Sequence, residues 1–262
     1  MDLQLNGKKA LVVAASKGIG KGVALALARE GCGVVITSSQ PDNLKKAETE
    51  IRSATKGQVW TYTMDVSDQG NVQKISAQIL KDHGRIDILV TNGPGPAMAD
   101  ADSVKDSALE SAVQINLLSV IQLSRIFLPA MKQNHFGRII NLTSVTAKEP
   151  AVGMVLSNIT RAGVLAYAKT LAREVAGHGI TVNSILTGGV QTDRTVDLRK
   201  QNAKRQGLSY EGLEKEAAKN FPVGYIATPE QFSHAIAFLA SPLSMYINGV
   251  SLPVDGGFLR GI

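Results

Sequence analysis

The sequence contains little of what several common kinds of site require. Its 262 residues include a single cysteine, Cys32, which makes a disulfide framework impossible. The four histidines are scattered, and none stands at ligand spacing from another histidine, a cysteine or an acid, so we expect no metal site. Aromatic residues make up 5% of the chain, which argues against a stacking platform for single-stranded nucleic acid. The basic residues are spread out without a recognition motif, and we expect no nucleic-acid partner.

A long uninterrupted hydrophobic run is also missing. Residues 1–9 are polar and lack the hydrophobic stretch of a signal peptide. The most apolar long segment, Ala112–Met131, is interrupted by the polar residues Gln114, Asn116, Gln122, Ser124 and Arg125. That makes the segment too polar for an uninterrupted membrane span of about twenty residues. We therefore expect a soluble, cytoplasmic protein without a membrane partner.

The overall composition is typical of a folded domain with a large core. Hydrophobic residues make up 44% and charged residues 19% of the chain, which excludes disorder and fibrous structure. With 28 Lys+Arg and 22 Asp+Glu, the formal net charge is +6. Half of that excess lies between Arg194 and Lys219, where seven residues are basic and four are acidic.

Short apolar runs alternate along the chain with longer amphipathic stretches. The runs predict strands at Lys9–Ala14, Gly33–Thr37, Val59–Met64, Ile86–Thr91, Gly137–Leu142, Ile180–Leu186 and Val250–Val254. The stretches predict helices at Gly20–Glu30, Asn43–Thr55, Asn71–His83, Ala108–Met131, Ser157–Gly177 and Pro229–Ala240. Near-continuous Val/Ile runs separated by helices indicate a parallel sheet covered on both faces. We predict a single α/β domain over residues 1–262, with a doubly wound parallel sheet in three αβα layers.

One segment, Gly188–Phe221, interrupts this alternation because it contains no predicted strand. A long insertion late in an α/β domain often covers the site at the carboxyl ends of the strands, so we predict a basic lid around residues 188–221. The alternative is a solvated helical face without a ligand role. The basic residues that would attract an acidic substrate by long-range steering are Arg194, Arg199, Lys200, Lys204 and Arg205.

A glycine turn follows the first predicted strand and precedes the first predicted helix. Its sequence is Ala14-Ala15-Ser16-Lys17-Gly18-Ile19-Gly20. Glycines let the backbone approach a pyrophosphate, and a helix N-terminus offers unpaired N–H groups and the positive end of its dipole. We therefore expect a Rossmann-like dinucleotide site, although glycines can also serve only a tight turn. The residues expected to bind the cofactor here are Ala14, Ser16, Lys17, Gly18, Ile19 and Gly20.

No acid stands at the end of the second predicted strand, where the sequence reads Thr37-Ser38-Ser39-Gln40. In dinucleotide sites an acid at this place bonds the ribose 2′-hydroxyl of NAD and would repel a 2′-phosphate. Lys17 adds positive charge near the place of such a phosphate. We expect NADP(H) as the cofactor, contacted by Ser38 and Ser39, with NAD as the alternative.

These and later motifs resemble, nearly end to end, the classical short-chain dehydrogenase/reductase family, most closely its branch around 3-oxoacyl-[acyl-carrier-protein] reductase. Val13–Gly20 corresponds to the glycine motif of that family, with Ala14 in place of the first glycine. Thr91–Pro94 corresponds to its NNAG turn and departs from it at three of four places. Pro253–Gly257 is typical of the ending of the family.

The resemblance also implies further cofactor contacts. Asp65 and Val66 correspond to the residues that meet the adenine in relatives. Asn92 and Gly93 belong to the turn that corresponds to NNAG. Thr192 keeps the position that contacts the nicotinamide carboxamide or the phosphate, and Gly188 ends a Thr-Gly turn in place of the usual Pro-Gly.

The catalytic positions of the family correspond only in part. Asn116 and Ser144 stand where relatives have a catalytic Asn and Ser. The YxxxK motif, about thirteen residues after the serine, corresponds to Ser157 and Arg161, and no tyrosine lies between Ser144 and Tyr167. Residues four apart share a helix face, so Ser157 and Arg161 are expected to point into the same pocket. Arg161 would bond a ribose hydroxyl of the cofactor or a developing oxyanion.

The missing tyrosine leaves three hypotheses open, since a serine hydroxyl is a much weaker acid and Arg161 stays protonated. The first is a reductase that takes its proton from water or from another residue, with Lys148 as the candidate. The second is hydride transfer to a conjugated system, in which Arg161 stabilises an enolate. The third is a regulatory or structural homologue that binds the nucleotide without catalysis.

The partners expected from the sequence are a small-molecule substrate and further copies of the chain. An acyl thioester is one substrate class that fits the resemblance. Two long helical patterns, Ala108–Met131 and Ser157–Gly177, are apolar on more than one side. Relatives pair these helices between subunits, so the resemblance implies a homotetramer.

Overall fold

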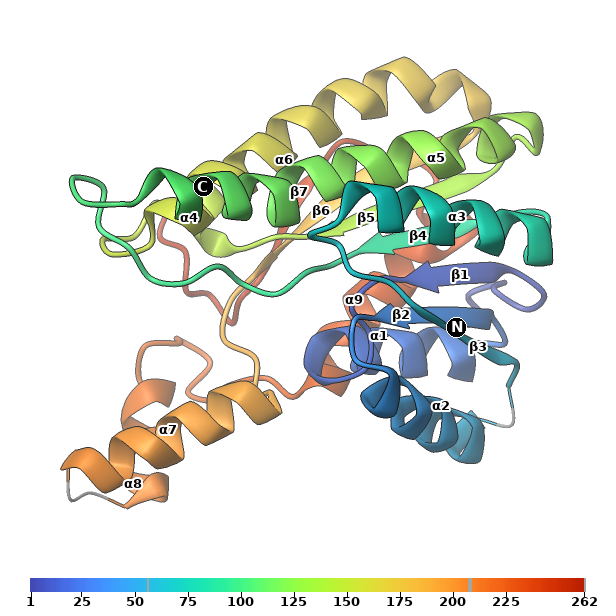
Figure 1. The fold of residues 1–262 in the computed structure, drawn as a ribbon. Helices are drawn as coiled ribbons and strands as arrows, with labels where there is room; N and C mark the ends of the chain where they lie inside the picture. Colours follow the sequence, from blue (N-terminus) through green and yellow to red (C-terminus); the bar gives the residue numbers. More distant parts are fainter. Residues whose placement is uncertain (56, 207–208, 262) are drawn as a thin grey trace.

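The computed structural model describes residues 1–55, 57–206 and 209–261, and within 193–206 it leaves out the side chains of Arg194, Leu198, Gln201, Asn202 and Gln206. Over these ranges, parallel strands form one seven-stranded sheet in the order β3-β2-β1-β4-β5-β6-β7 (Figure 1). The strands are β1 (Lys9–Val12), β2 (Gly33–Ser38), β3 (Val59–Thr63), β4 (Ile88–Thr91), β5 (Gly137–Leu142), β6 (Ile180–Thr187) and β7 (Ser251–Val254). The predicted doubly wound parallel sheet is confirmed.

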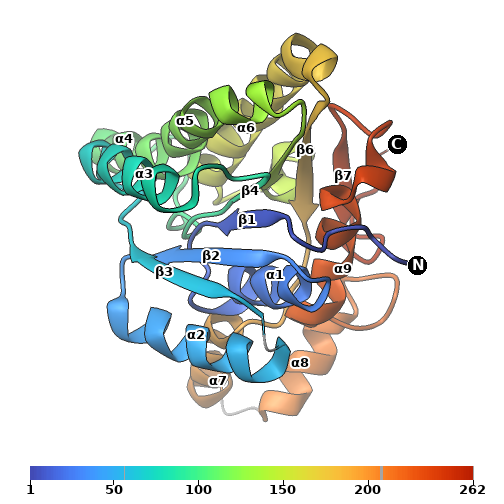
Figure 2. The same ribbon diagram turned by 90° about the vertical axis from the view of Figure 1, so that its right-hand side faces the viewer.

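Helices cover both faces of the sheet, as Figure 2 shows. One face is covered by α1 (Gly18–Arg29), α2 (Pro41–Thr55) and α9 (Pro229–Ala240). The other is covered by α3 (Gln69–His83), α5 (Ser119–Gln133) and α6 (Val155–Val175). The central strands are buried on both sides, which accounts for their continuous Val/Ile runs. This is the three-layer αβα arrangement expected from the sequence.

The order of the strands reverses between β1 and β4, which are neighbours in the sheet. In open α/β sheets the connections leave in opposite directions at such a point, and a crevice forms beyond the carboxyl ends of the two strands. The strand order alone therefore predicts a ligand-binding crevice at the carboxyl ends of β1 and β4.

The helical stretch predicted over Ala108–Met131 is confirmed, but it is not a regular α-helix throughout. The structure has α4 (Asp106–Val113), then a π-helical turn at Gln114–Leu118, then α5. Within and beside this turn, side chains bond backbone carbonyls of the preceding turn: Asn116 Nδ2 donates to Ala112 O at 3.3 Å, and Ser119 Oγ donates to Ile115 O at 2.6 Å. Such side-chain bonds compete with the regular backbone ladder and bend or widen helices.

The stretch Asp106–Gln133 meets, by length and composition, the requirements of a membrane-spanning helix, because an 18-residue window within it has a mean hydropathy of 1.4. Core helices of soluble proteins meet the same requirements, so one such stretch is weak evidence for a membrane. In this fold α5 packs on α3 and on the sheet through Leu123, Phe127 and Met131. That no membrane partner exists stays a prediction.

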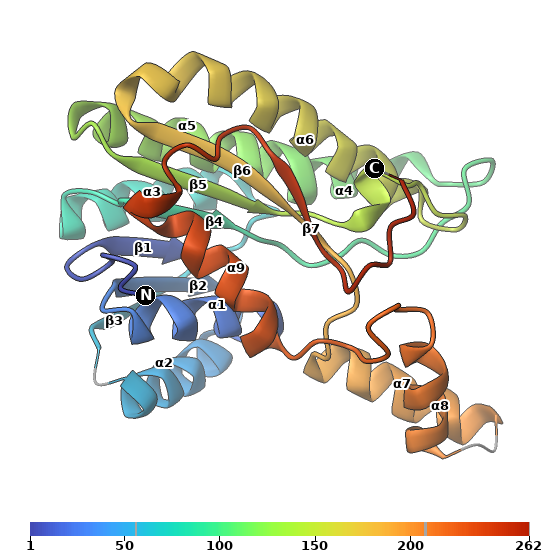
Figure 3. The ribbon, with the colours of Figure 1, turned by 180° about the vertical axis from the view of Figure 1, so that it is seen from behind.

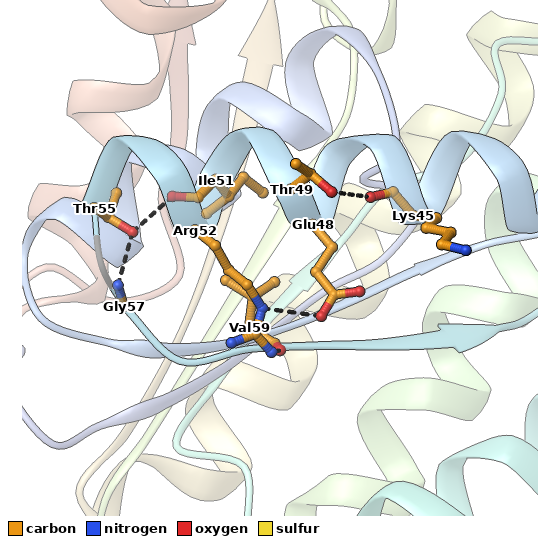
Figure 4. A network of polar contacts seen from close by, with 8 residues as sticks. All are labelled: Lys45, Glu48, Thr49, Ile51, Arg52, Thr55, Gly57 and Val59. Carbon is orange, nitrogen blue, oxygen red and sulfur yellow. Dashed lines mark hydrogen bonds and ion pairs between the residues drawn. The ribbon is translucent and has the colours of Figure 1, made fainter.

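Polar contacts connect the end of α2 to the edge strand β3 (Figure 4). Thr55 Oγ1 donates to Ile51 O at 2.8 Å and accepts from Gly57 N at 3.1 Å. Arg52 Nη2 donates to Val59 O, the first carbonyl of β3. These bonds satisfy backbone groups at the helix end and fix the connection that leads back into the sheet.

The segment predicted to be a lid forms two helices, α7 (Asp193–Gln206) and α8 (Tyr210–Ala218), which project from the body of the molecule (Figures 1 and 3). Its two ends meet at the sheet. Val190 forms a parallel bridge with Ala227, and Gln191 N donates to Ala227 O at 2.8 Å. Whether this segment closes over a ligand stays a prediction.

Candidate active site

A cleft of about 450 Å³ lies at the carboxyl ends of β1 and β4, where the strand order reverses. Its walls contain every residue predicted to bind the cofactor except Arg161 and Gly188. Those present are Ala14, Ser16, Lys17, Gly18, Ile19, Gly20, Ser38, Ser39, Asp65, Val66, Asn92, Gly93 and Thr192. Pro94, from the turn that corresponds to NNAG, also lines the cleft. The lining further includes residues that the sequence did not single out, namely Met64, Ser67, Gly95, Ile115 and Asp193.

The glycine turn brings the backbone close to the cleft. A Cβ at Gly20 would lie 2.5 Å from Ala14 O and 2.8 Å from Ala15 Cα, so this position admits only glycine without rearrangement. Gly18 is the first residue of α1 and has φ +55°. Lys17 precedes it at the N-cap position, and its side chain makes no capping hydrogen bond. The first N–H groups of α1 are therefore free to bind an anion.

Ala14 shows where the first strand was predicted too long. The prediction extended it to Ala14, but β1 ends at Val12 and Ala14 has φ +51°. A left-handed conformation costs a residue with a Cβ about 1–2 kcal/mol, which is why this position favours glycine. Asn92 Nδ2 donates to Ala14 O at 3.2 Å and holds the turn in this conformation.

Hydroxyl groups and a lysine line the cleft at the end of β2. Ser16 Oγ donates to Ser38 Oγ at 2.9 Å, which in turn accepts from Gln40 N at 3.2 Å. Lys17 and Ser39 are exposed beside them. This arrangement suits a phosphate, because hydroxyls donate to its oxygens and Lys17 supplies positive charge.

An acid lies further along the cleft, at the end of β3. Asp65 Oδ1 accepts from Ser67 N at 2.9 Å and from Ser67 Oγ at 2.7 Å. Asn71 Oδ1 accepts from Asp65 N at 2.9 Å, so both ends of the residue are fixed. With Val66, Asp65 forms the wall at which the sequence predicts the adenine.

Three hydroxyl groups form a line behind the end of β5. Thr146 Oγ1 donates to Ser144 Oγ at 3.0 Å, and Thr146 Oγ1 and Ser157 Oγ lie 3.0 Å apart. Thr146 and Ser157 are each 6% exposed. The structure therefore connects two predicted catalytic residues through Thr146, which the sequence analysis missed. A hydroxyl two residues after Ser144 was the only sequence signal for it.

Arg161 lies on α6, one turn after Ser157, and is 7% exposed. Its Nη1 donates to Leu142 O, at the end of β5, at 3.0 Å. Within the described part of the chain no carboxylate pairs with its guanidinium. Burial lowers the pKa of Arg161 from 12.5 to about 10, so the group remains a cation at neutral pH. A buried cation that lacks an acid partner favours an anion or a developing negative charge beside it.

Asn116 lies in the π-helical turn and is buried. Its Oδ1 finds no hydrogen-bond partner among residues 1–55, 57–206 and 209–261. A Cβ at Gly93 would lie 4.0 Å from this oxygen, so Asn116 stands next to the turn that lines the cleft. The unpaired oxygen is available to a water molecule or a ligand hydroxyl.

The remaining predicted residues lie at the edges of the site. Gly188 N donates to Val254 O at 3.2 Å, and a Cβ on Gly188 would come 2.6 Å from Asp255 Cα, so glycine permits β6 and the C-terminal segment to meet. Lys148, the candidate proton donor, is exposed on the turn after Thr146 and forms no described side-chain bond to Ser144. The geometry gives Lys148 no support.

The basic residues of the predicted lid are only partly described. The side chain of Arg194 lies outside the described residues. Lys200, Lys204 and Arg205 are exposed, whereas Arg199 is half-buried. Thr192, just before α7, comes within contact of the glycine turn, since a Cβ at Gly18 would lie 3.2 Å from its Cγ2. The beginning of the segment therefore touches the phosphate end of the cleft.

Among the described residues no three His, Cys, Asp or Glu side chains group as metal ligands do. The rings of His135 and His178 stack with centroids 6.4 Å apart, a proximity that their separation in the sequence did not reveal. Cys32 is buried, and burial raises the pKa of its thiol to about 12, which suits a packed side chain and not a nucleophile.

Comparison with known proteins agrees with this architecture. A family model described as enoyl-(acyl carrier protein) reductase matches residues 13–259. NADPH-dependent reductase BacG of Bacillus subtilis is 31% identical, over 98% of this chain and 100% of the relative. 3-Oxoacyl-[acyl-carrier-protein] reductase FabG of Thermotoga maritima is 30% identical, over 98% of this chain and 100% of the relative.

A solved structure is similar over the whole chain. L-sorbose reductase from Gluconobacter frateurii, complexed with NADPH and L-sorbose, has a TM-score of 0.96 at 28% identity, with 100% of both chains covered. The match of the family model, the relatives and the strand order together show that this chain belongs to the enoyl-(acyl carrier protein) reductase family of the short-chain dehydrogenases/reductases.

Proposed function

We propose that the protein is an NADP(H)-dependent reductase that transfers hydride to a carbon–carbon double bond conjugated to a carbonyl group. The observation that carries this proposal is that the end of β5 has hydrogen-bond donors but, among the residues that the structure describes, no acid suited to donate a proton. Arg161 donates to Leu142 O, and the Ser144 hydroxyl keeps a proton that it can donate to a ligand, but neither group is an acid that titrates near neutral pH.

The cofactor assignment rests on the cleft. The glycine turn and the N-terminus of α1 fit a pyrophosphate, and Ser16, Lys17, Ser38 and Ser39 fit a 2′-phosphate. NADPH in that cleft supplies the hydride. Structures of relatives contain NADPH, and BacG is NADPH-dependent, which supports the same cofactor for this chain.

The choice of a conjugated acceptor follows from charge. Hydride added directly to a carbonyl carbon leaves an alkoxide, which needs a proton at once, as the family's tyrosine would provide. Hydride added to the far carbon of a conjugated system leaves an enolate, whose charge is spread over several atoms. Hydrogen bonds from Ser144 and from the Arg161 cation can stabilise that enolate until water donates the proton.

The test is anaerobic oxidation of NADPH with matched substrate pairs: methyl vinyl ketone against methyl ethyl ketone, and a crotonyl thioester against an acetoacetyl thioester. We expect turnover of the conjugated member of each pair and little of its partner. Faster turnover of the saturated ketone or the 3-oxo thioester would favour ordinary carbonyl reduction. Tight NADPH binding without oxidation in any pair would favour a non-catalytic homologue.

Two further expectations concern the context of the reaction. An acyl thioester substrate and a cytoplasmic location are consistent with the family and stay proposals. A homotetramer is supported by exposed apolar side chains on the two long helical stretches, such as Leu118 and Ile159, which are 38% and 48% exposed. A monomeric sedimentation coefficient at micromolar protein would contradict the tetramer.

A further inference from the structure

The three hydroxyl groups at the end of β5 form a chain whose direction follows from the bond that Thr146 donates to Ser144. A hydroxyl donates one bond and accepts two. Ser144 caps the turn Val145–Ala147, so its Oγ accepts from Thr146 N at 3.2 Å and also from Thr146 Oγ1 at 3.0 Å. Both of its acceptor positions are filled, and only its proton is left.

The proton of Thr146 is used in its bond to Ser144. The contact of 3.0 Å between Thr146 Oγ1 and Ser157 Oγ therefore has Ser157 as its donor. The three groups form a directed chain in which Ser157 donates to Thr146 and Thr146 donates to Ser144. Each bond polarises the next, which strengthens the last donor in the line.

The proton of Ser144 has no acceptor among the described side chains and carbonyls. Ser144 is itself half-buried, whereas Thr146 and Ser157 are buried behind it. The free end of the chain is thus the end that a ligand can reach. Such a group meets a carbonyl oxygen as a donor and cannot accept a bond in the same state.

We propose that Thr146 is a positioning residue that orients the Ser144 hydroxyl as a donor to the substrate's carbonyl oxygen, with Ser157 as the buried end of the chain. This rests on the proposed function for its kinetic consequence, but the orientation of Ser144 is a property of the protein before any hydride moves. Ser157, at the position that corresponds to the tyrosine of the family, thereby has a role of its own: it donates a hydrogen bond to Thr146.

The role of Thr146 is tested with variants that each differ from the wild type by one small chemical group. Thr146→Val removes the hydroxyl and keeps the shape, whereas Thr146→Ser keeps the hydroxyl. Ser157→Ala removes the buried end of the chain. Thr160→Val is the matched control, because Thr160 is also a buried threonine but its Oγ1 donates to Leu156 O, within α6, at 2.7 Å.

In the kinetic arm we expect Thr146→Val to lower kcat about tenfold with a smaller change in KM, since the bond strengthens as charge develops on the oxygen. Thr146→Ser should recover most of the loss, and Ser157→Ala should lower kcat by a factor of about three. Thr160→Val should match the wild type in kcat, and the dissociation constant of NADPH should stay within about twofold in all variants. A kcat for Thr146→Val equal to that of the control would overturn the proposal.

A second arm needs no turnover. Methyl vinyl ketone is replaced by its saturated analogue, methyl ethyl ketone, which is titrated by calorimetry into the complex of each protein with NADP⁺, where hydride transfer cannot occur. We expect Thr146→Val to weaken binding about tenfold and Thr146→Ser to restore it.

The two arms together separate the two proposals. If the ketone affinities of the wild type and the variants follow this order but the wild type oxidises no NADPH with any substrate, the proposed function fails and the role of Thr146 stands. If turnover is normal and binding is equal in all variants, only the role of Thr146 fails. A wild type that neither binds the ketone nor oxidises NADPH with any substrate overturns both.

Discussion

The two halves of the site differ in what their function depends on. In the cofactor half, between β1 and β4, the glycine turn and the start of α1 present backbone N–H groups to the cleft. In the proposed substrate half, at the end of β5, we assign function to the side chains of Ser144, Thr146, Ser157 and Arg161. A substitution leaves the backbone N–H group of a residue in place, whereas it replaces the functional group of the side chain. A family can therefore keep its cofactor while the chemistry beside it changes.

Ala14 and Ser157 illustrate the difference. Ala14 replaces a family glycine, yet the turn keeps its left-handed backbone at φ +51° and the cleft remains. By its resemblance to the family, Ser157 stands where relatives are expected to have the tyrosine that donates the proton, and the proposed function follows from that difference. We expect the first substitution to change stability and the second to change which reaction can be catalysed.

The largest effect is expected from a clash in the cofactor half. Gly20→Ala would place a Cβ 2.5 Å from Ala14 O, and relieving this clash costs about 3 kcal/mol. If the turn has to leave its binding conformation, the affinity for NADPH should fall by roughly a hundredfold. Fluorescence titration of NADPH measures it. Gly177→Ala is the control, because nothing lies within 4 Å of a Cβ there. Equal affinities in the two variants would show that the cofactor is bound elsewhere.

Next in size is the loss of charge in the substrate half. Arg161→Met should lower kcat by about a hundredfold, in the range expected for one lost oxyanion donor, while NADPH affinity changes much less. Arg161→Lys keeps the charge, so its kcat should lie between those of the wild type and Arg161→Met. A loss of NADPH affinity as large as the loss of kcat would instead assign Arg161 to the ribose of the cofactor.

The same residue predicts a pH dependence. The pKa of Arg161 is lowered by burial to about 10, so the rate should be steady at neutral pH and should fall as the pH rises towards that value. Its folded pKa lies below its ordinary value of 12.5, so losing this proton raises the free energy of unfolding and does not promote unfolding. Circular dichroism at each pH separates the two effects. A rate that stays constant through this range would contradict the role of the cation.

A smaller effect is expected at the end of β2. Ser39→Asp places a carboxylate beside the predicted 2′-phosphate, and it should lower the preference for NADPH over NADH by about tenfold through repulsion and a bond to the ribose. The ratio of the two dissociation constants measures this preference. Ser39→Asn, of the same shape without charge, is the control, and an equal shift in both would exclude an electrostatic cause.

The smallest effect concerns the strained turn. Ala14→Gly should raise the free energy of unfolding by about 0.5–1 kcal/mol, because glycine adopts φ +51° without the penalty of a Cβ but is freer in the unfolded chain. Chemical denaturation measures the change, and NADPH affinity should stay the same. A destabilised Ala14→Gly would mean that the alanine methyl contributes packing that outweighs its strain.

Local signals predicted the fold, and they predicted most of the residues that line the cleft between β1 and β4. Strands such as Gly137–Leu142 and helices such as Pro229–Ala240 match the prediction at both ends, because apolar runs and capping residues are encoded in neighbouring positions. The glycine turn was found for the same reason. Sequence spacing also placed Ser157 and Arg161 on one helix, one turn apart.

The substrate half was less predictable because its contacts join separate segments. Thr146 is supported by Ser157, a residue eleven positions away on another element, and nothing in the neighbouring sequence marks this contact. The π-helical turn at Gln114–Leu118 depends on side-chain bonds within a helix that otherwise reads as continuous. No pattern of apolar residues carries either kind of information.

The bridge between Val190 and Ala227 has a consequence for how the protein can diversify. Because the two ends of the α7–α8 segment are bonded to each other, the chain between them forms a closed excursion that the sheet does not need for its own pairing. For a flexible loop, doubling the length of such an excursion costs only about 0.6 kcal/mol of closure entropy. The chain beyond Asp193 can therefore change in length without breaking the pairing of the sheet. Thr192 and Asp193, at the start of the segment, line the cofactor cleft and tie it to the site.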